Sequence, residues 1–308
     1  MIFILSNNND TSTKYVIEWL NFLKKDWLCI NAQDNVEIEF CGDEIILKTV
    51  SFSIKLSEIK GFWYRRGYLS VNNDFITQIN QFDSLQSEEL NYLIQFIYYK
   101  LTKIKNINSI ANSDVNKLIV NDIAKELGIL TPRDLLFSNA NDLKSELKKD
   151  STSYITKVIS GRCMQNFEDF TIFNYTNLVE IDKIKTETFF PSLIQNYIDK
   201  KYELRIFYLD GDFYTMAIFS QNDNKTNIDF RNYNYDRPNR TVPFKLPKEI
   251  ESSLNLLMKK LDLNCGSIDM VVTPKNEYVF LEVNPIGQFG MISYPCNYNL
   301  EKKIAEYL

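Results

Sequence analysis

The sequence contains no histidine among its 308 residues. Histidine is the side chain that titrates nearest neutral pH, and it is the commonest metal ligand in proteins. Its absence excludes a Ser-His-Asp triad, a Cys-His nucleophile pair and a zinc site built on histidine. Any chemistry must therefore use carboxylates, amides, lysine, arginine and backbone groups, which are suited to hard cations and phosphates.

Glycine is also scarce, with nine residues in the chain, well below an average usage of about 7%. Neither GxxxxGK[ST] nor GxGxxG occurs, so a P-loop and the usual dinucleotide fingerprint are excluded. The longest apolar runs fall short of the roughly 18 residues of a membrane helix. The start MIFILSNNND lacks the basic flank of a signal peptide. We therefore expect no membrane association.

The net charge and the cysteine pattern limit the possible binding partners and the cellular compartment. Lysine and arginine number 35 and the acidic residues 40, which gives a net charge of −5 without any basic block. Nucleic-acid binding is therefore not expected. The odd number of widely spaced cysteines, without a CxxC pair, predicts buried thiols in a reducing compartment, here the cytoplasm. They are Cys29, Cys41, Cys163, Cys265 and Cys296.

Helix and strand patterns alternate along the chain, which predicts a mixed α/β fold with an α/β lobe at the N-terminus. At about 150 residues per domain, the length suggests two domains or three small lobes. We expect lobes over 1–108, 109–190 and 191–308. Residues 83–104 have the pattern of a long amphipathic helix, and Asp114 is a plausible N-cap for a helix that Gly128 ends.

A predicted hairpin between Ser267 and Asn284 carries the most informative side chains. Alternation puts Ile268, Met270 and Val272 on one face and Asp269 on the other. In the second strand we expect Val279, Leu281 and Val283 to share a face, with Glu282 and Asn284 opposite. Asp269, Glu282 and Asn284 would then form one set of oxygen donors suited to Mg²⁺. A half-exposed hairpin with a merely polar outer face is the alternative.

Three further segments supply groups that a magnesium nucleotide needs. Lys157 shares a strand face with isoleucines, where its ammonium either meets an anion or extends along the strand to solvent. Residues 195–198 (Gln-Asn-Tyr-Ile) are typical of a strand whose backbone pairs with an adenine edge. Glu203 and Arg205 share one strand face, suited either to ribose and phosphate or to a cross-strand ion pair.

Taken in order, these pieces resemble the ATP-grasp superfamily, with matching residues from about Asn112 to Asn284. The resemblance implies an ATP-grasp fold in which two lobes enclose the nucleotide behind the N-terminal lobe. It implies that Lys117 and Lys157 hold phosphates, and that Gln195, Asn196, Tyr197 and Ile198 border the adenine. It also implies Glu203 at the ribose, Arg205 at the transferring phosphate, and Asp269, Glu282 and Asn284 on Mg²⁺, with Asn284 also near the nucleotide.

The flanking segments resemble a narrower family, the graspetide or microviridin-type peptide ligases of the grasp-with-spasm branch. The matching segments are residues 63–67 with Arg65 and Arg66, a loop from Arg231 to Arg240, and residues 284–290 (Asn-Pro-Ile-Gly-Gln-Phe-Gly). This resemblance covers nearly the whole chain. It makes Arg65, Arg66, Arg205, Arg231 and Arg240 candidates for binding an acidic substrate. Otherwise Arg65 and Arg66 are a solvent-exposed pair at a strand end, and the loop is a basic surface loop.

The resemblance implies an ATP-dependent ligase. It would phosphorylate Asp or Glu side chains of a ribosomal precursor peptide and close ester or amide rings with Thr, Ser or Lys. The expected cofactors are ATP and Mg²⁺, and the expected partners are a second copy of the chain and a peptide with a leader and a Thr/Glu/Asp-rich core. Two alternatives stay open: a ligase that adds amino acids to a protein tail or small acid, and a nucleotide-gated peptide-binding protein without turnover.

Overall fold

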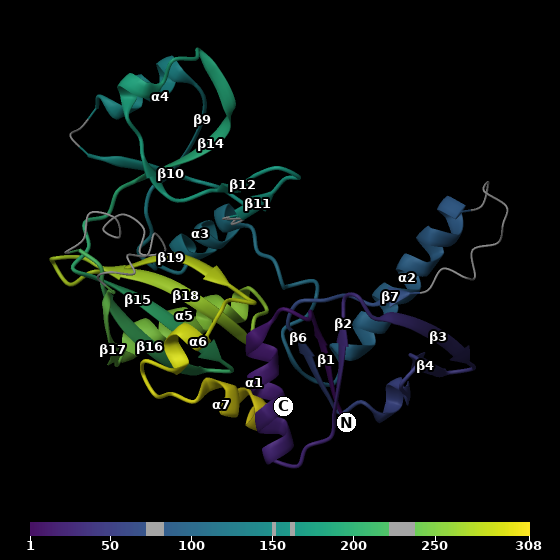
Figure 1. Ribbon diagram of the computed structural model, residues 1–308. Coiled ribbons are helices and arrows are strands. Elements are labelled where there is room, and N and C mark those ends of the chain that lie inside the picture. Colours follow the sequence, from purple (N-terminus) through teal and green to yellow (C-terminus); the bar gives the residue numbers. More distant parts are fainter. Residues whose placement is uncertain (72–82, 150–151, 161–163, 222–237) are drawn as a thin grey trace. The chain divides into compact units, whose positions relative to one another are not determined.

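The computed structural model describes residues 1–71, 83–149, 152–160, 164–221 and 238–308 (Figure 1). The chain forms two compact units. Unit 1 contains Met1–Asp114, Leu263–Cys265 and Pro285–Leu308, and unit 2 contains Val115–Asp262 and Gly266–Asn284. The three lobes expected from the sequence, with bounds at 108 and 190, stay a prediction.

Unit 1 is built on a parallel sheet with the strand order β2-β1-β6-β8. Its two central strands, β1 and β6, are almost entirely buried, as expected of parallel strands covered on both faces, whereas the edge strands β2 and β8 are only partly buried. A second sheet has the order β5-β4-β3-β7, in which β3 and β4 form a hairpin around Gly42. The strands are β1 (Ile2–Ser6), β2 (Trp27–Asn31), β3 (Asn35–Cys41), β4 (Glu44–Lys48), β5 (Ser53–Lys55), β6 (Gly61–Tyr64), β7 (Ser70–Val71) and β8 (Lys105–Ile107).

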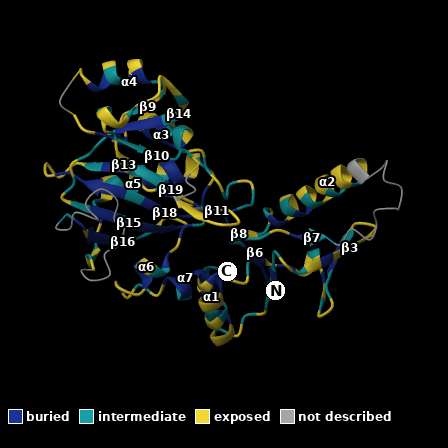
Figure 2. Cartoon of the chain, turned by 45° about the horizontal axis from the view of Figure 1, so that its top comes forward, coloured by how far each residue is buried: buried dark blue, intermediate teal, exposed yellow. Residues whose placement is uncertain are grey.

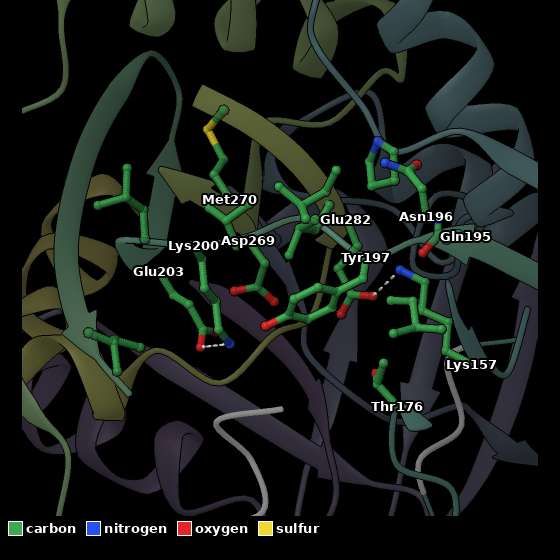
Figure 3. Close-up of a pocket in the computed structure, with 17 residues that line it drawn as sticks. Lys157, Thr176, Gln195, Asn196, Tyr197, Lys200, Glu203, Asp269, Met270 and Glu282 are labelled. Atoms are coloured by element: carbon green, nitrogen blue, oxygen red, sulfur yellow. Dashed lines mark hydrogen bonds and ion pairs between the residues drawn. The ribbon is translucent and has the colours of Figure 1, made fainter. Parts of the chain in front are cut away.

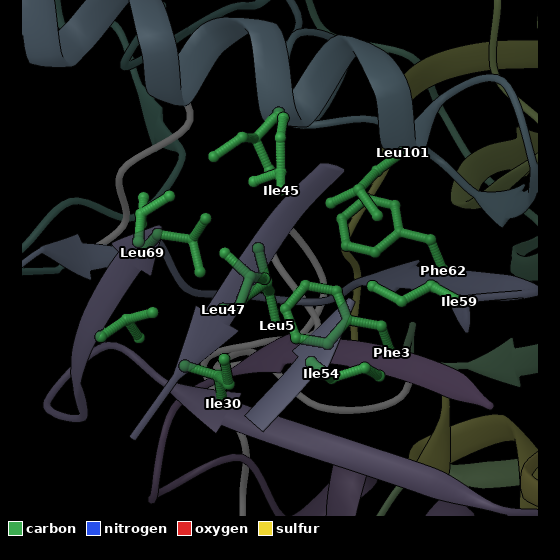
Figure 4. Close-up of a cluster of buried hydrophobic side chains, with 13 residues drawn as sticks. Phe3, Leu5, Ile30, Ile45, Leu47, Ile54, Ile59, Phe62, Leu69 and Leu101 are labelled. Carbon is green, nitrogen blue, oxygen red and sulfur yellow. The ribbon is translucent and has the colours of Figure 1, made fainter. Parts of the chain in front are cut away.

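One apolar core joins these two sheets and helix α2 (Asp83–Leu101). Phe3 and Phe62 stack within this core. Helix α2 contributes Leu101, labelled in Figure 4, and Ile97. The other helices of unit 1 are α1 (Thr11–Phe22), α6 (Gly290–Ser293) and α7 (Leu300–Tyr307), with a 3-10 turn at Leu56–Glu58. The C-terminal residues therefore complete the N-terminal unit.

Unit 2 contains two main antiparallel sheets. One has the order β13-β10-β14-β9 and the other β17-β16-β15-β18-β19, while β11 and β12 form a separate hairpin. Its helices are α3 (Lys117–Glu126), α4 (Ala140–Leu147) and α5 (Lys248–Lys260), with a 3-10 turn at Ile181–Lys183. The strands are β9 (Asp134–Asn139), β10 (Tyr154–Lys157), β11 (Met164–Asn166), β12 (Thr171–Phe173), β13 (Asn177–Leu178), β14 (Thr188–Asn196), β15 (Tyr202–Leu209), β16 (Asp212–Phe219), β17 (Arg240–Phe244), β18 (Cys265–Val272) and β19 (Tyr278–Asn284).

Several local expectations need correction. Asn116, and not Asp114, caps α3, because its side chain accepts hydrogen bonds from the backbone amides of Leu118 and Ile119. The helix expected over 83–104 ends at Leu101. Of the four described cysteines, all free, Cys41 is exposed and Cys29 is half-buried, so the expectation of uniformly buried thiols is wrong.

Helix α2 has apolar side chains on two opposite faces. Ile97 and Leu101 are buried in the core, while Tyr92, Phe96 and Tyr99 are exposed. Much of α2 is coloured as exposed in Figure 2. Such a helix differs from an ordinary surface helix, whose outer face is polar. Its outer face is therefore a candidate contact surface. No helix in the described part of the chain combines the length and the apolar character that crossing a bilayer requires.

Candidate functional site

A pocket in unit 2 is lined by residues from both of its main sheets (Figure 3). Strands β10 and β14 of one sheet contribute Lys157 and residues 195–196, and the 197–200 connection adds to the wall. Strands β15, β18 and β19 of the other sheet contribute Glu203, Asp269 and Glu282. Most of the residues predicted from the sequence for nucleotide and metal thus line one cavity.

The β18–β19 hairpin places its two carboxylates together. Asp269 pairs with Glu282 in the antiparallel register, and Ser267 pairs with Asn284 at the strand end. Directly opposed side chains lie about 5 Å apart at their Cβ atoms. Two carboxylates in this relation, with the exposed Asn284 two residues along, fit the oxygen ligands that Mg²⁺ prefers.

A β-bulge changes the rest of this hairpin. The register shifts between Asp269 and Met270, so that Met270 pairs with Phe280 and Leu281 is the extra residue. A bulge reverses the alternation beyond it. The expectation that Val279, Leu281 and Val283 share one face is therefore wrong. Phe280 is fully buried, and Leu281 lines the pocket beside Glu282.

Two lysines approach the same carboxylate from different elements. Nζ of Lys117, at the first residue of α3, lies 2.7 Å from Oε2 of Glu282. Nζ of Lys157, on β10, lies 3.9 Å from the same oxygen. The three side chains are each less than a fifth exposed. The structure thus brings together two residues predicted for phosphates and one predicted for the metal.

Glu203 is buried beside two partners that the sequence did not indicate. Its Oε1 accepts hydrogen bonds from Lys200 Nζ at 2.5 Å and from Ser220 Oγ at 2.6 Å. Burial raises the pKa of Glu203 above its ordinary value, although Lys200 and Ser220 oppose that shift. Lys200 also lines the pocket. Its position three residues before Glu203 is a signal that sequence reasoning could have used.

Arg205 pairs with Asp269 and not with Glu203. Because β15 and β18 are neighbouring strands, the Arg205–Asp269 pair is a cross-strand ion pair of the kind expected as the alternative, while Glu203 pairs with Lys200. Arg205 Nε is buried without a hydrogen-bond partner among the described residues. The Arg205–Asp269 pair thus connects the residue predicted at the phosphate to the predicted metal ligands.

In segment 195–198, which the sequence predicts to border the adenine, the side chains of Gln195 and Asn196 form hydrogen bonds within the protein. Gln195 Nε2 donates to Asp134 Oδ1 at 2.5 Å, and Asn196 Oδ1 accepts from the backbone amide of Arg133 at 2.6 Å. The backbone amide of Tyr197 donates to Ser153 at 2.7 Å. Within the described residues, the Ile198 backbone forms no such bond. Ile198 also lines the pocket.

The remaining arginines have unlike surroundings. Arg65 is buried, so the expectation of an exposed pair at the strand end is wrong for it, whereas Arg66 is about two-fifths exposed. Arg240 lies on β17, and its guanidinium carbon is 5.7 Å from the centre of the Phe219 ring. Arg231 lies outside the described residues. Among those that are described, no group of three or more Asp, Glu, Cys or His side chains is placed to hold a metal ion.

The two sheets, the converging lysines and the acidic hairpin define a nucleotide-binding ligase of the ATP-grasp class. A family model described as the RimK-like ATP-grasp domain matches residues 111–308, and the chain belongs to that family. The ATP-grasp fold expected from the sequence is confirmed, and so is the assignment as an ATP-grasp ligase. No curated protein sequence matches the chain.

Solved structures extend the likeness to the whole chain. The macrocyclase MdnC of Microcystis aeruginosa MRC, bound with precursor peptide MdnA, is 26% identical with a TM-score of 0.79, covering 100% of this chain and 99% of its own. A Chryseobacterium gregarium RiPP-associated ATP-grasp ligase, in complex with ADP and a leader and core peptide, is 23% identical with a TM-score of 0.81, covering 99% and 94%. The M. aeruginosa macrocyclase MdnB is 21% identical with a TM-score of 0.75, covering 100% and 98%. The expected resemblance to peptide macrocyclases is thereby confirmed.

Proposed function

We propose that the protein uses ATP to phosphorylate Asp or Glu side chains of a ribosomally made precursor peptide, which then forms macrocycles. A Thr or Ser hydroxyl, or a Lys amine, of the same peptide attacks the acyl phosphate. An ester or amide forms, and ADP and phosphate are released. The full-length likeness to MdnC, which is bound with its precursor peptide, is the observation that carries this proposal.

The pocket of unit 2 supplies the groups for the first step. Lys157, Glu203 and residues 195–198 line this pocket, and Lys117 pairs with Glu282 in its wall. In this proposal Lys117 and Lys157 hold the phosphates of ATP, the 195–198 backbone borders the adenine, and Glu203 accepts hydrogen bonds from the ribose hydroxyls. Asp269, Glu282 and Asn284 hold Mg²⁺, which neutralises charge on the phosphoryl group when bound. Catalysis by these residues is mainly positioning and electrostatic stabilisation.

The arginines steer the acidic substrate. Arg205, held by Asp269 at the metal hairpin, orients the carboxylate that receives the phosphoryl group. Arg66, Arg231 and Arg240 are proposed to bind other acidic groups of the peptide. Arg65, also predicted for this role, has a buried guanidinium that is paired with Asp10, which supports a different role for it.

The proposed function also concerns the peptide substrate, the cellular compartment and the oligomeric state. We propose that the peptide carries a leader and a core rich in Thr, Glu and Asp, and that the reaction takes place in the cytoplasm. The enzyme would act as a homodimer. The exposed aromatic face of α2 supports this, because Glu88 and Glu89 lie towards one end of the helix and Lys100 towards the other. Such a face is complementary to an antiparallel copy of itself.

The decisive experiment combines the protein, ATP, Mg²⁺ and the peptide encoded beside its gene. The peptide should lose one water per ring in the mass spectrum. With ¹⁸O in the side-chain carboxylates, one ¹⁸O per ring should appear in the released phosphate, because the carboxylate oxygen leaves with it. A gain of mass would identify a ligase that adds amino acids. Nucleotide-dependent peptide binding with unchanged mass would identify a receptor without turnover.

A further inference from the structure

Residues 285–288, which directly follow β19, are held by three side chains at one edge of the parallel sheet of unit 1. Strands β1, β6 and β8 run in the same direction, so their carboxyl ends meet at that edge. Arg65 follows β6, Asn108 follows β8, and Ser12 lies in the helix that follows β1. In open α/β sheets, this edge is where ligands usually bind. Here it holds a segment of the chain itself.

Arg65 makes most of these contacts. Its Nη1 donates to the carbonyl oxygens of Ile286 at 2.7 Å and Gly287 at 3.1 Å, and its Nη2 donates to Gln288 Oε1 at 3.3 Å. Its guanidinium carbon also lies 5.3 Å from the centre of the Phe289 ring. The planar fork of arginine suits several acceptors in fixed directions, which an ammonium cannot reproduce.

The guanidinium is itself held from behind. Arg65 Nε donates to Asp10 Oδ2 at 3.1 Å, while Asp10 Oδ1 accepts from the backbone amide of Thr13 and caps α1. The side chains of Arg65 and Asp10 are only 3% and 0% exposed. Burial lowers the pKa of Arg65 from its ordinary value, and Asp10 opposes that shift. A buried ion pair adds little stability compared with apolar packing. The role of Arg65 is therefore inferred from the groups that accept its hydrogen bonds, which belong to segment 285–288.

Asn108 and Ser12 complete the hold. Asn108 Nδ2 donates to the carbonyl oxygen of Pro285 at 2.9 Å and also to that of Cys265. Ser12 Oγ donates to Gln288 Oε1 at 2.9 Å. The carbonyls of three consecutive residues, 285–287, therefore each accept a hydrogen bond from a buried side chain of this edge.

We propose that Arg65 is a positioning residue for magnesium, acting with Asn108 through segment 285–288. That segment begins at the residue after Asn284 and two residues after Val283, so any shift of it moves the end of the strand that carries Glu282 and Asn284. The inference rests on the proposed function, in which Glu282 and Asn284 hold the metal. Arg65 itself touches neither substrate nor cofactor.

The test is a magnesium titration of nucleotide binding, followed with a fluorescent ATP analogue and without peptide. Arg65→Lys keeps the charge beside Asp10 but loses the fork. It should raise the Mg²⁺ concentration for half-saturation by about 10- to 100-fold, the usual effect of removing a group that supports metal ligands. In the cyclisation assay its kcat should fall at low Mg²⁺ and recover at high Mg²⁺, with the KM for peptide unchanged.

A matched control separates positioning from general stability. Lys25 donates to the carbonyls of Ala305 and Glu306 in the same unit, at 3.0 Å each, far along the chain from segment 285–288. Lys25→Met should lower the Tm and leave the Mg²⁺ half-saturation unchanged. If Arg65→Lys does not fold, Gln288→Leu removes only the acceptor shared by Arg65 and Ser12, and it should shift the half-saturation in the same direction.

Three outcomes overturn the proposal. An unchanged Mg²⁺ half-saturation in folded Arg65→Lys and Gln288→Leu would show that the contacts are only structural. A raised KM for peptide with normal Mg²⁺ dependence would restore the substrate-binding role predicted for Arg65. An equal shift in Lys25→Met would show a general loss of stability. If the wild type binds Mg²⁺ and nucleotide but leaves the peptide unchanged, the proposed function fails while this inference still stands on the titration.

Discussion

Lys117 Nζ lies 2.7 Å from Glu282 Oε2, so a residue proposed for phosphate and a residue proposed for metal form an ion pair. Lys157 approaches the same oxygen at 3.9 Å. A nucleotide phosphate would attract both lysines, and a divalent cation would attract the carboxylate. Nucleotide binding would draw the lysines away from Glu282 and leave this carboxylate available to the metal, and metal binding at Glu282 would leave the lysines available to the phosphates. We expect nucleotide and Mg²⁺ to bind with positive, reciprocal coupling.

Replacing either lysine should weaken nucleotide binding and uncouple it from the metal. A charged hydrogen bond contributes about 1.5–3 kcal/mol, so Lys117→Met or Lys157→Met should raise the Kd for ADP by about 10- to 150-fold. The dependence of that Kd on Mg²⁺ should become weaker. Isothermal titration at several Mg²⁺ concentrations measures both effects. Lys183→Met, which removes an exposed lysine paired with Glu180, is the control. An equally strong Mg²⁺ dependence in all three variants would contradict the coupling.

Asp269 should matter for the metal more than for the nucleotide. Asp269→Asn keeps the size of the side chain but removes the charge that faces Arg205 and adjoins Glu282. We expect the Mg²⁺ half-saturation to rise at least about 10-fold, with ADP binding without metal changed little. Glu277→Gln, in the turn of the same hairpin, should behave like the wild type. Unaltered Mg²⁺ dependence in Asp269→Asn would remove Asp269 from the metal site.

Nucleotide affinity should fall as the solution is acidified, and the fall should begin at a higher pH than it would if Glu203 had the ordinary pKa of a glutamate. Burial raises the pKa of Glu203, so Glu203 takes up its proton, and loses its ion pair with Lys200, while other carboxyl groups are still ionised. The Kd for ADP should therefore rise as pH falls through this raised pKa. In Glu203→Gln, the Kd should be higher and nearly independent of pH over the same range.

The contribution of Glu203 to folding stability should change with pH in the opposite direction to its effect on nucleotide affinity. Because its pKa is higher in the folded than in the unfolded chain, the folded protein binds the proton more tightly. This group therefore stabilises the fold fully below the unfolded pKa, and that contribution is lost as pH rises through the folded pKa. Thermal melts against pH, in wild type and Glu203→Gln, measure the difference. A wild-type curve parallel to that of the variant would contradict the raised pKa.

The sequence predicted those parts of the site that depend on strand periodicity. Alternation placed Asp269 opposite the buried Ile268 and Met270, and it placed Glu282 beside Asn284. The bulge at Leu281 was not predictable, because nothing in the alternation of residues 278–284 distinguishes an extra residue from a regular one. The side-chain partners of Gln195 and Asn196 were not predictable either, since Asp134 and Arg133 are about 60 residues away.

Arg65 shows the same limit for long-range contacts. From the chain alone, the two adjacent arginines at the end of β6 are predicted either to bind an acidic substrate or to form a solvent-exposed pair. Their environments differ because Arg65 meets Asp10 and three residues more than 220 positions later. Position 67 requires glycine because of another contact between residues far apart in the sequence: a Cβ there would lie 2.4 Å from the carbonyl oxygen of Ser6. Contacts between residues so distant in sequence can be identified only from the folded structure.

The outer face of α2 provides the test of the proposed homodimer. Phe96 is 47% and Tyr92 62% exposed, and Lys100 lies over the Phe96 ring with its ammonium nitrogen 5.4 Å from the ring centre. In an antiparallel pair of these helices, Phe96 would lie near the two-fold axis, with Glu89 of one copy facing basic residues of the other. Phe96→Glu would bring two like charges together at that axis and should give a monomer.

Sedimentation at several protein concentrations measures the association. Asn91→Asp adds the same charge to an exposed residue that lies about 140° around the helix from Phe96, and should leave the dimer intact. Glu89→Lys should weaken association, and adding Lys100→Glu should restore part of it, because the charges are then exchanged and not removed. A wild type that sediments as a monomer at all concentrations, or a Phe96→Glu variant that stays dimeric, would mean that this face does not join two copies.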